Sequence, residues 1–263
     1  DEKMFSIDWL HIPRFHPEII KDHFKIKPFV GFYALYQLLK CVLLNGFGKE
    51  TEVNIKNISN KINYLFVSHI INAEQLPIKE DFYFGSLSEN KESYTIYINH
   101  TKTSENIINK KLNSHQLLLS RRVSTSLNFQ FLSAMVQSFF IISYKILFKK
   151  NIAKKNFLKL LRSRVISSGT LANYRIKHQI KNIVTKLNPK KVFITFEGHG
   201  YEKFIVAGVR EVSKNIECVG YLHSSFFKNQ KSLFIRYGLK YDLDKILTTG
   251  EIAYNLFIAN NFE

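Results

Sequence analysis

KVFITFEGHG, residues 191–200, begins the part of the chain that decides the fold. Residues 191–196 form a short run of β-branched and aromatic side chains, which is typical of a buried strand. Residues 201–214 carry apolar side chains at helical spacing, and a second apolar run over 218–222 ends at His223. A strand, a helix and another strand in this order predict the βαβ unit of a parallel sheet.

Titratable side chains follow both strands of this unit, Glu197 after the first strand and His223 after the second. In open parallel sheets, ligands bind outside the carboxyl ends of the strands. We therefore expect Glu197 and His223 to lie at the same edge of the sheet and to form a shared site. A carboxylate seldom ends a buried strand without a partner, which favours a functional role for Glu197.

The rest of the chain alternates between strand and helix patterns. We expect further strands over 62–67, 94–98 and 245–249, and helices over 125–148, 154–167, 171–187 and 251–259. This alternation predicts an α/β fold with a Rossmann-like, mostly parallel sheet flanked by helices. We divide the chain into an irregular and helical segment over 1–60, which includes a helix over 29–45 and packs on the main domain, and an α/β domain over 61–263.

Both ends of the sequence suggest a longer polypeptide. The chain begins with Asp1 rather than a methionine, and it ends at Glu263 directly after a predicted helix. We therefore expect the chain to be truncated at both ends, with a further part of the active site outside it.

The net charge of +17 is unevenly distributed along the chain. Residues 145–164 contain eight lysines and arginines and no aspartate or glutamate, with apolar side chains interleaved. A basic amphipathic stretch of this kind is typical of segments that lie on an anionic membrane surface. The alternatives are a solvated basic helix face and a codon bias towards lysine that carries no function. No nucleic-acid-binding module accompanies the charge, so we do not expect nucleic acid as a partner.

Residues 123–144 carry no charged side chain, and this segment is long enough to cross a bilayer at about 20 residues per span. Serine, threonine, asparagine and glutamine interrupt the apolar run at many positions. We therefore expect a long buried helix that covers the sheet rather than a membrane span.

Several classes of site are excluded by the sequence. The chain has no Gly-x-Gly-x-x-Gly after a strand, no phosphate loop, no Gly-x-Ser-x-Gly and no His-Glu-x-x-His. Cys41 and Cys218 lie far apart in apolar runs, which excludes a disulfide scaffold and a cysteine zinc cluster. The nine histidines show no clustered ligand spacing. We therefore expect no metal and no bound cofactor.

Three motifs resemble those of bacterial surface-carbohydrate biosynthesis proteins: Glu197-Gly198-x-x-x-Glu202, Gly220-Tyr221-x-His223-Ser224 and Ile246-Leu-Thr-Thr-Gly250. Members of that family are assigned as glycosyltransferases with two Rossmann-like domains, the GT-B arrangement, and they make O-antigen, capsule or related polysaccharide. Ser68-His69 and Asp81-x-Tyr83-Phe84-Gly85 resemble the amino-terminal half of the same family. The resemblance covers roughly residues 62–250. One departure is His199-Gly200, where a bulkier residue or a proline is more usual than glycine.

The chemistry of glycosyl transfer gives roles to particular residues. Glu197 would deprotonate the acceptor hydroxyl, or stabilise or trap an oxocarbenium-like centre. His223, together with the Ser224 and Ser225 hydroxyls, would neutralise the departing phosphate or bind an anionic sugar. Glu202 falls in the first turn of the predicted helix, where it either takes part in catalysis or stabilises the helix start. Substrate binding is assigned to Gly198, His199, Ser224, Ser225 and His69.

These observations lead to a predicted function. We expect the acceptor-side half of a GT-B glycosyltransferase for a cell-surface polysaccharide, working in the cytoplasm at the inner membrane face. The nucleotide sugar would be the donor substrate and a glycan or lipid-linked molecule the acceptor. One alternative is a non-catalytic carbohydrate- or membrane-associated scaffold of the same fold. Another is a nucleotide-sugar-processing enzyme such as an epimerase, which the missing glycine-rich loop disfavours.

Overall fold

The computed structural model describes residues 35–36, 39–40, 61–75, 80–223 and 231–260. These residues divide into two compact units. The α/β unit takes its described residues from Glu52–Ser120, Ile176–Phe227 and Gly238–Glu263, and the helical unit from Asp1–Thr51, Arg121–Arg175 and Lys228–Tyr237. This division differs from the predicted one, because residues 121–175 are separate from the α/β domain expected over 61–263. The predicted segment over 1–60, with its helix, lies almost entirely outside the described residues.

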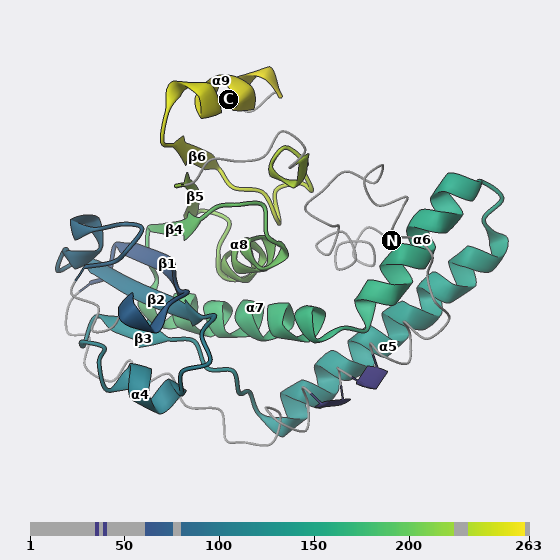
Figure 1. The fold of residues 1–263 in the computed structure, drawn as a ribbon, viewed down its shortest axis with the longest axis horizontal. Helices are drawn as coiled ribbons and strands as arrows, with labels where there is room; N and C mark the ends of the chain where they lie inside the picture. Colours follow the sequence, from purple (N-terminus) through teal and green to yellow (C-terminus); the bar gives the residue numbers. More distant parts are fainter. Residues whose placement is uncertain (1–34, 37–38, 41–60, 76–79, 224–230, 261–263) are drawn as a thin grey trace. The chain divides into compact units, whose positions relative to one another are not determined.

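The α/β unit is built on a six-stranded sheet in which all paired strands are parallel (Figure 1). The order across the sheet is β3-β2-β1-β4-β5-β6. The strands are β1 (Tyr64–Ile70), β2 (Ser93–Asn99), β3 (Gln116–Leu118), β4 (Lys191–Thr195), β5 (Glu217–Leu222) and β6 (Lys245–Thr248). Such an order, with the chain running outwards from a central pair in both directions, defines a Rossmann-like fold. The predicted fold class is confirmed.

Two details of the sheet differ from the prediction. β1 runs from Tyr64 to Ile70 instead of over 62–67, so Ser68 and His69 lie within the strand and not after it. β3 has no counterpart among the predicted strands, because its three residues are too few to show an alternating pattern. The other predicted strands match β2, β4, β5 and β6 to within one or two residues.

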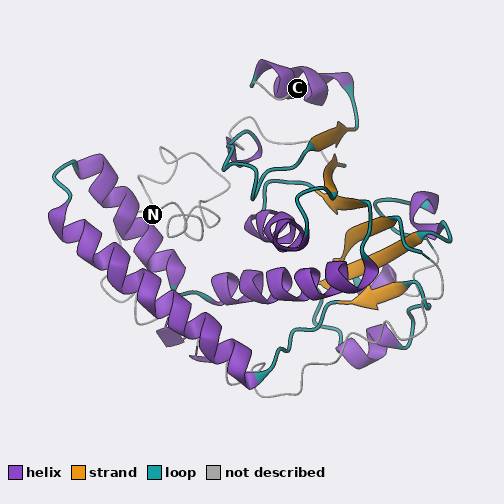
Figure 2. Ribbon diagram, turned by 180° about the vertical axis from the view of Figure 1, so that it is seen from behind, coloured by secondary structure: helices purple, strands orange, loops and turns teal. Residues whose placement is uncertain are grey.

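Two helices, α7 (Ser168–Leu187) and α8 (Gly200–Val212), contribute to the main hydrophobic core on one face of the sheet (Figure 2). Ile180 and Val184 of α7, together with Ile205 and Val209 of α8, belong to the same buried cluster as strand residues. Those strand residues are Leu65, Val67, Tyr94, Ile96, Val192, Ile194 and Cys218. Since buried apolar area is the main favourable term in folding, this cluster fixes the sheet against α7 and α8.

The opposite face of the sheet is aromatic. The Phe66 ring stacks on Phe193 with ring centroids 4.9 Å apart, and Phe84 contacts Phe66 at 5.0 Å. Nearby, Ile108 of α4 (Glu105–Asn109) is buried among Ile70, Tyr97 and Leu118. α9 (Glu251–Ala259) follows β6 and has the bounds that the sequence predicts.

Gly208 lets α8 approach the middle of α7 closely. A Cβ atom at this position would lie 2.7 Å from the Lys177 carbonyl oxygen and 3.3 Å from Cγ2 of Ile180. We expect Gly208→Ala to lower the free energy of unfolding by about 1–2 kcal/mol, because the clash outweighs the better helix propensity of alanine. Urea denaturation measures this change. Gly169→Ala is the matched control, since its Cβ would meet only Ser167 Oγ at 3.8 Å; equal stability of the two variants would contradict the close approach.

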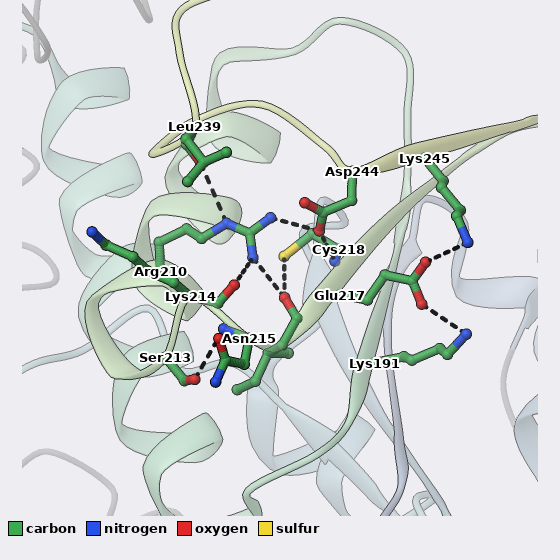
Figure 3. A network of polar contacts seen from close by, with 11 residues as sticks. Lys191, Arg210, Ser213, Lys214, Asn215, Glu217, Cys218, Leu239, Asp244 and Lys245 are labelled. Carbon is green, nitrogen blue, oxygen red and sulfur yellow. Dashed lines mark hydrogen bonds and ion pairs between the residues drawn. The ribbon is translucent and has the colours of Figure 1, made fainter. Parts of the chain in front are cut away.

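Arg210 of α8 is the centre of a buried polar network (Figure 3). Its guanidinium donates to the Asp244 carboxylate at 2.6 Å and to the carbonyl oxygens of Ile216 (2.6 Å), Lys214 (3.2 Å) and Leu239 (3.3 Å). The same Asp244 oxygen accepts a hydrogen bond from the Cys218 backbone N–H at 2.6 Å. The network therefore ties the end of α8 to β5 and to the segment that leads into β6.

The helical unit contains a pair of helices, α5 (Thr125–Phe148) and α6 (Ile152–Val165). Ile142 and Ile146 of α5 pack with Leu158, Leu161 and Val165 of α6. The prediction that α5 is a buried helix covering the sheet is wrong: only 22% of its most apolar 18-residue window is buried. By length and composition alone, α5 is the one helix of the described part that could cross a membrane. The apolar composition of this segment predicted a helix correctly, but it did not predict how much of the helix is buried.

Candidate functional site

The candidate site lies where the strand order reverses. β1 pairs with β2 on one side and with β4 on the other, and in folds of this type ligands bind at such a switch point beyond the carboxyl ends of the strands. Four neighbouring strands bring a titratable side chain to this edge. They are His100 after β2, His69 near the end of β1, Glu197 after β4 and His223 after β5.

The Glu197 carboxylate lies between two imidazoles. One of its oxygens is 3.2 Å from Nε2 of His223, and the other is 3.0 Å from Nε2 of His199. The predicted meeting of Glu197 and His223 is therefore confirmed. Nε2 is therefore the nitrogen of His223 that faces the carboxylate, and Nδ1 is buried. Burial lowers the pKa of His223, whereas the Glu197 carboxylate and the Tyr221 carbonyl act in the opposite direction.

A second group of side chains is linked to the first through Tyr201. Nδ1 of His69 lies 2.9 Å from Nε2 of His100, and Nε2 of His69 lies 3.4 Å from the Tyr201 hydroxyl. The Tyr201 ring stacks on His199 with centroids 5.1 Å apart. Burial, followed by the neighbouring His100 and His199, lowers the pKa of His69 to about 3. A neutral His69 has a single ring proton, so it donates through one nitrogen and accepts through the other.

The segment between Asp81 and Gly85 places an aromatic ring against the site. The Asp81 carboxylate accepts hydrogen bonds from the backbone N–H groups of Tyr83 (2.9 Å) and Phe84 (2.8 Å), and Gly85 has a φ of 54°. This turn positions the Tyr83 ring edge-on to His223, with centroids 4.4 Å apart. Burial raises the pKa of Tyr83, and the Glu197 and Asp81 carboxylates act in the same direction, so the hydroxyl keeps its proton at neutral pH.

Glu202 holds the loop that carries Glu197. Its carboxylate is buried, with the residue 1% exposed, and it accepts hydrogen bonds from three consecutive backbone N–H groups. These belong to Glu197 (2.8 Å), Gly198 (2.9 Å) and His199 (2.9 Å). Gly198 makes the turn possible, since its φ of 79° is one that other residues rarely adopt. The geometry therefore favours the helix-start role of Glu202 over the catalytic one.

We expect Glu202→Gln to lower the free energy of unfolding by about 1–3 kcal/mol, because the amide NH₂ would face a backbone N–H and leave it without an acceptor. Burial raises the pKa of Glu202 from 4.5 to about 8, outweighing the backbone donors and Lys203. The folded protein then holds a proton that the unfolded chain releases above pH 4.5. The stabilisation by wild-type Glu202 is thus fully present at low pH and is lost as the pH rises towards 8.

Urea unfolding between about pH 5 and pH 8 tests this expectation. The stability difference between wild type and Glu202→Gln should shrink as the pH rises, because glutamine does not titrate. Glu211→Gln, on the same helix, is the control, since Glu211 forms partly exposed ion pairs with Lys177 and Lys181 and its pKa is lowered. A difference that stays constant over this range would show that the Glu202 pKa is not raised.

The structure brings together most of the predicted site residues. Glu197, His199, His223 and His69 lie around one edge of the sheet, with Gly198 in the supporting turn. Ser224 and Ser225 lie outside the described residues. Sequence reasoning missed His100, Tyr83 and Tyr201 as parts of the site. His100 directly follows a strand, which is the signal that singled out Glu197 and His223, and it could have been found in the same way.

The chemistry of this edge is that of proton transfer and hydrogen bonding. Among the described residues, no group of three or more His, Cys, Asp and Glu side chains has a geometry that could hold a metal ion. A carboxylate with an imidazole at each oxygen can accept a proton from a ligand hydroxyl, and the tyrosine hydroxyls can donate. Comparison with protein-family models, with curated proteins and with solved structures gives no match for this chain.

Proposed function

We propose that this chain is the acceptor-side domain of a glycosyltransferase that builds a bacterial surface polysaccharide, with a nucleotide sugar as donor. The observation that carries the proposal is the Glu197 carboxylate, held between His199 and His223 at the switch point of a Rossmann-like sheet. The resemblance of the surrounding motifs to surface-carbohydrate biosynthesis proteins adds to it. Rossmann-like folds host many unrelated activities, so the proposal rests on the site and its motifs rather than on the fold.

In the proposed reaction, Glu197 accepts the proton of the acceptor hydroxyl as the O–H bond breaks. The hydroxyl oxygen forms a new bond to the anomeric carbon of the donor sugar. The bond between that carbon and the phosphate oxygen breaks, and its electron pair leaves with the nucleoside diphosphate. His199 and His223 hold the carboxylate in position, because each contacts one of its oxygens.

The neutral side chains of the site would bind the acceptor. His69 is buried, and its two ring nitrogens face His100 and the Tyr201 hydroxyl, so this neutral side chain would orient those two groups towards the acceptor. The Tyr83 and Tyr201 rings lie beside the histidines that contact Glu197. Sugars combine hydroxyl groups with apolar C–H faces, so a site of imidazoles and tyrosines suits them.

Sugar transfer by the purified full-length protein tests the proposal. A panel of nucleotide sugars is incubated with glycan and lipid-linked acceptors, and both the nucleoside diphosphate and the extended acceptor are measured. Acceptor-dependent release from at least one donor is the expected result. Binding of a glycan without release from any donor would instead support a carbohydrate-binding scaffold, the alternative that the fold allows.

A further inference from the structure

The α5–α6 hairpin presents an apolar surface on α5 that α6 does not cover. Phe129, Val136, Phe140, Tyr144 and Leu147 recur at spacings of three, four and seven residues, and their exposed fractions run from 42% to 75%. This spacing places them on one face of a helix, which we call the apolar stripe. Residues of α5 that pack on α6, such as Ile142 and Ile146, lie on the opposite face. Exposed contiguous apolar surface of this kind marks an interaction site.

The apolar stripe continues around the turn of the hairpin. Phe148 at the end of α5 is 68% exposed, and Ile152 at the start of α6 is 75% exposed. Lys149 and Lys150 lie between them and are also exposed. Apolar and basic side chains thus occupy the same end of the hairpin, which is how segments bound to a bilayer surface are composed.

The charge of the hairpin has one sign only. Between Thr125 and Val165 it contains eight basic residues, Lys145, Lys149, Lys150, Lys154, Lys155, Lys159, Arg162 and Arg164. The sequence has no aspartate or glutamate anywhere between Glu105 and Glu197. The hairpin therefore supplies +8 of the net charge of +17. Codon bias alone explains neither the missing acids nor the exposed stripe beside the lysines.

We propose that the α5–α6 hairpin docks on the surface of an anionic lipid bilayer, with the apolar stripe entering the acyl-chain boundary and the lysines contacting lipid phosphates. Charge complementarity selects this partner, because an uncharged or cationic surface would gain nothing from eight basic residues. The hairpin lies on the membrane and does not span it. α6 packs along α5 and carries five of the basic residues, which are not tolerated in the hydrocarbon core.

Vesicle flotation with the full chain tests this docking. We expect binding to phosphatidylcholine vesicles that contain phosphatidylglycerol to be about tenfold or more tighter than to phosphatidylcholine alone. Raising the salt concentration from about 0.1 M to 1 M shortens the Debye length from about 10 Å to about 3 Å, and it should release the protein. Equal binding to both vesicles, or retention after a high-salt and carbonate wash, would overturn the proposal.

Variants separate the two contributions. Phe140→Gln with Leu147→Gln, and Lys149→Glu with Lys150→Glu, should each weaken binding about tenfold or more while leaving the circular dichroism spectrum unchanged. The matched control is Ile252→Gln with Leu256→Gln in α9, whose exposed apolar residues have no basic neighbours within the helix. An equal loss in the control would contradict a specific surface. A dimer in light scattering that Phe140→Gln with Leu147→Gln abolishes would show that a second copy, not lipid, covers the stripe.

Discussion

Glu197→Gln should lower the rate of sugar transfer by the full-length protein roughly 10²-fold or more, the usual scale for a general base. Glutamine keeps the size of the side chain and one acceptor oxygen, but it cannot take up a proton. The amide would also place a donor opposite His199 or His223, each of which now contacts a carboxylate oxygen. The main effect should fall on kcat, because the proton moves only in the reaction itself.

Glu217→Gln is the matched control for this substitution. Glu217 is the first residue of β5, so it lies at the amino ends of the strands, away from the candidate site. There it forms ion pairs with Lys191 at 2.7 Å and Lys245 at 2.8 Å (Figure 3). Because these pairs are partly exposed, the variant should lose less than about 1 kcal/mol of stability and keep its activity. Near-normal transfer by Glu197→Gln, with wild-type thermal stability, would show that another group acts as the base.

Arg210→Ala should lower the free energy of unfolding by about 3–5 kcal/mol, the range for breaking a buried ion pair by removing one partner. The Arg210 side chain is 4% exposed, and its loss would remove the cation that pairs with the Asp244 carboxylate and the donor to three carbonyl oxygens. Urea denaturation of the purified protein measures the change. Since the network ties α8 to β5, the substitution should also weaken the packing of α8 on the sheet.

Arg164→Ala is the control, because Arg164 is exposed in the last turn of α6 and should contribute only about 0.3–1 kcal/mol to the helix end. A second variant, Arg210→Ala combined with Asp244→Asn, removes the uncompensated charge. It should be more stable than Arg210→Ala alone, by the part of the loss that comes from the unpaired carboxylate. A loss below about 1 kcal/mol for Arg210→Ala would mean that the network contributes little to the fold.

The hydrophobic pattern of the sequence was enough to predict the sheet, but it did not predict which surfaces of each element are buried. Five of the strands show apolar and β-branched runs between helical segments, and this alternation predicts parallel pairing whatever the details of packing. β3 was not predicted, because its three residues show no strand pattern of their own and form a strand only by pairing with β2. The burial of α5 was predicted wrongly. The apolar residues of a helix show that the helix has a surface that avoids water, but they do not show which partner covers that surface.

Some contacts of the candidate site could be predicted from the sequence and others could not. Glu197 and His223 follow strands in sequence, so their meeting could be predicted from topology alone. The role of Glu202 could not, because three backbone N–H groups converge on its carboxylate only after Gly198 adopts a positive φ. Tyr83 reaches His223 from a turn that is far away in sequence, and no spacing rule connects the two.

The alignment of His100, His69, Glu197 and His223 on successive strands gives the site a length and a direction. Three intervals between neighbouring strands, at about 4.8 Å each, make a row of about 14 Å. The row is chemically polarised: its β5 end holds the carboxylate with two imidazoles, and its β2 end holds the neutral His69 with its partner. With Glu197 as the base of the proposed reaction, a molecule lying along the row would lose a proton only at its β5 end. In the proposed reaction, an elongated acceptor would therefore have to place its reacting hydroxyl at the β5 end of the row.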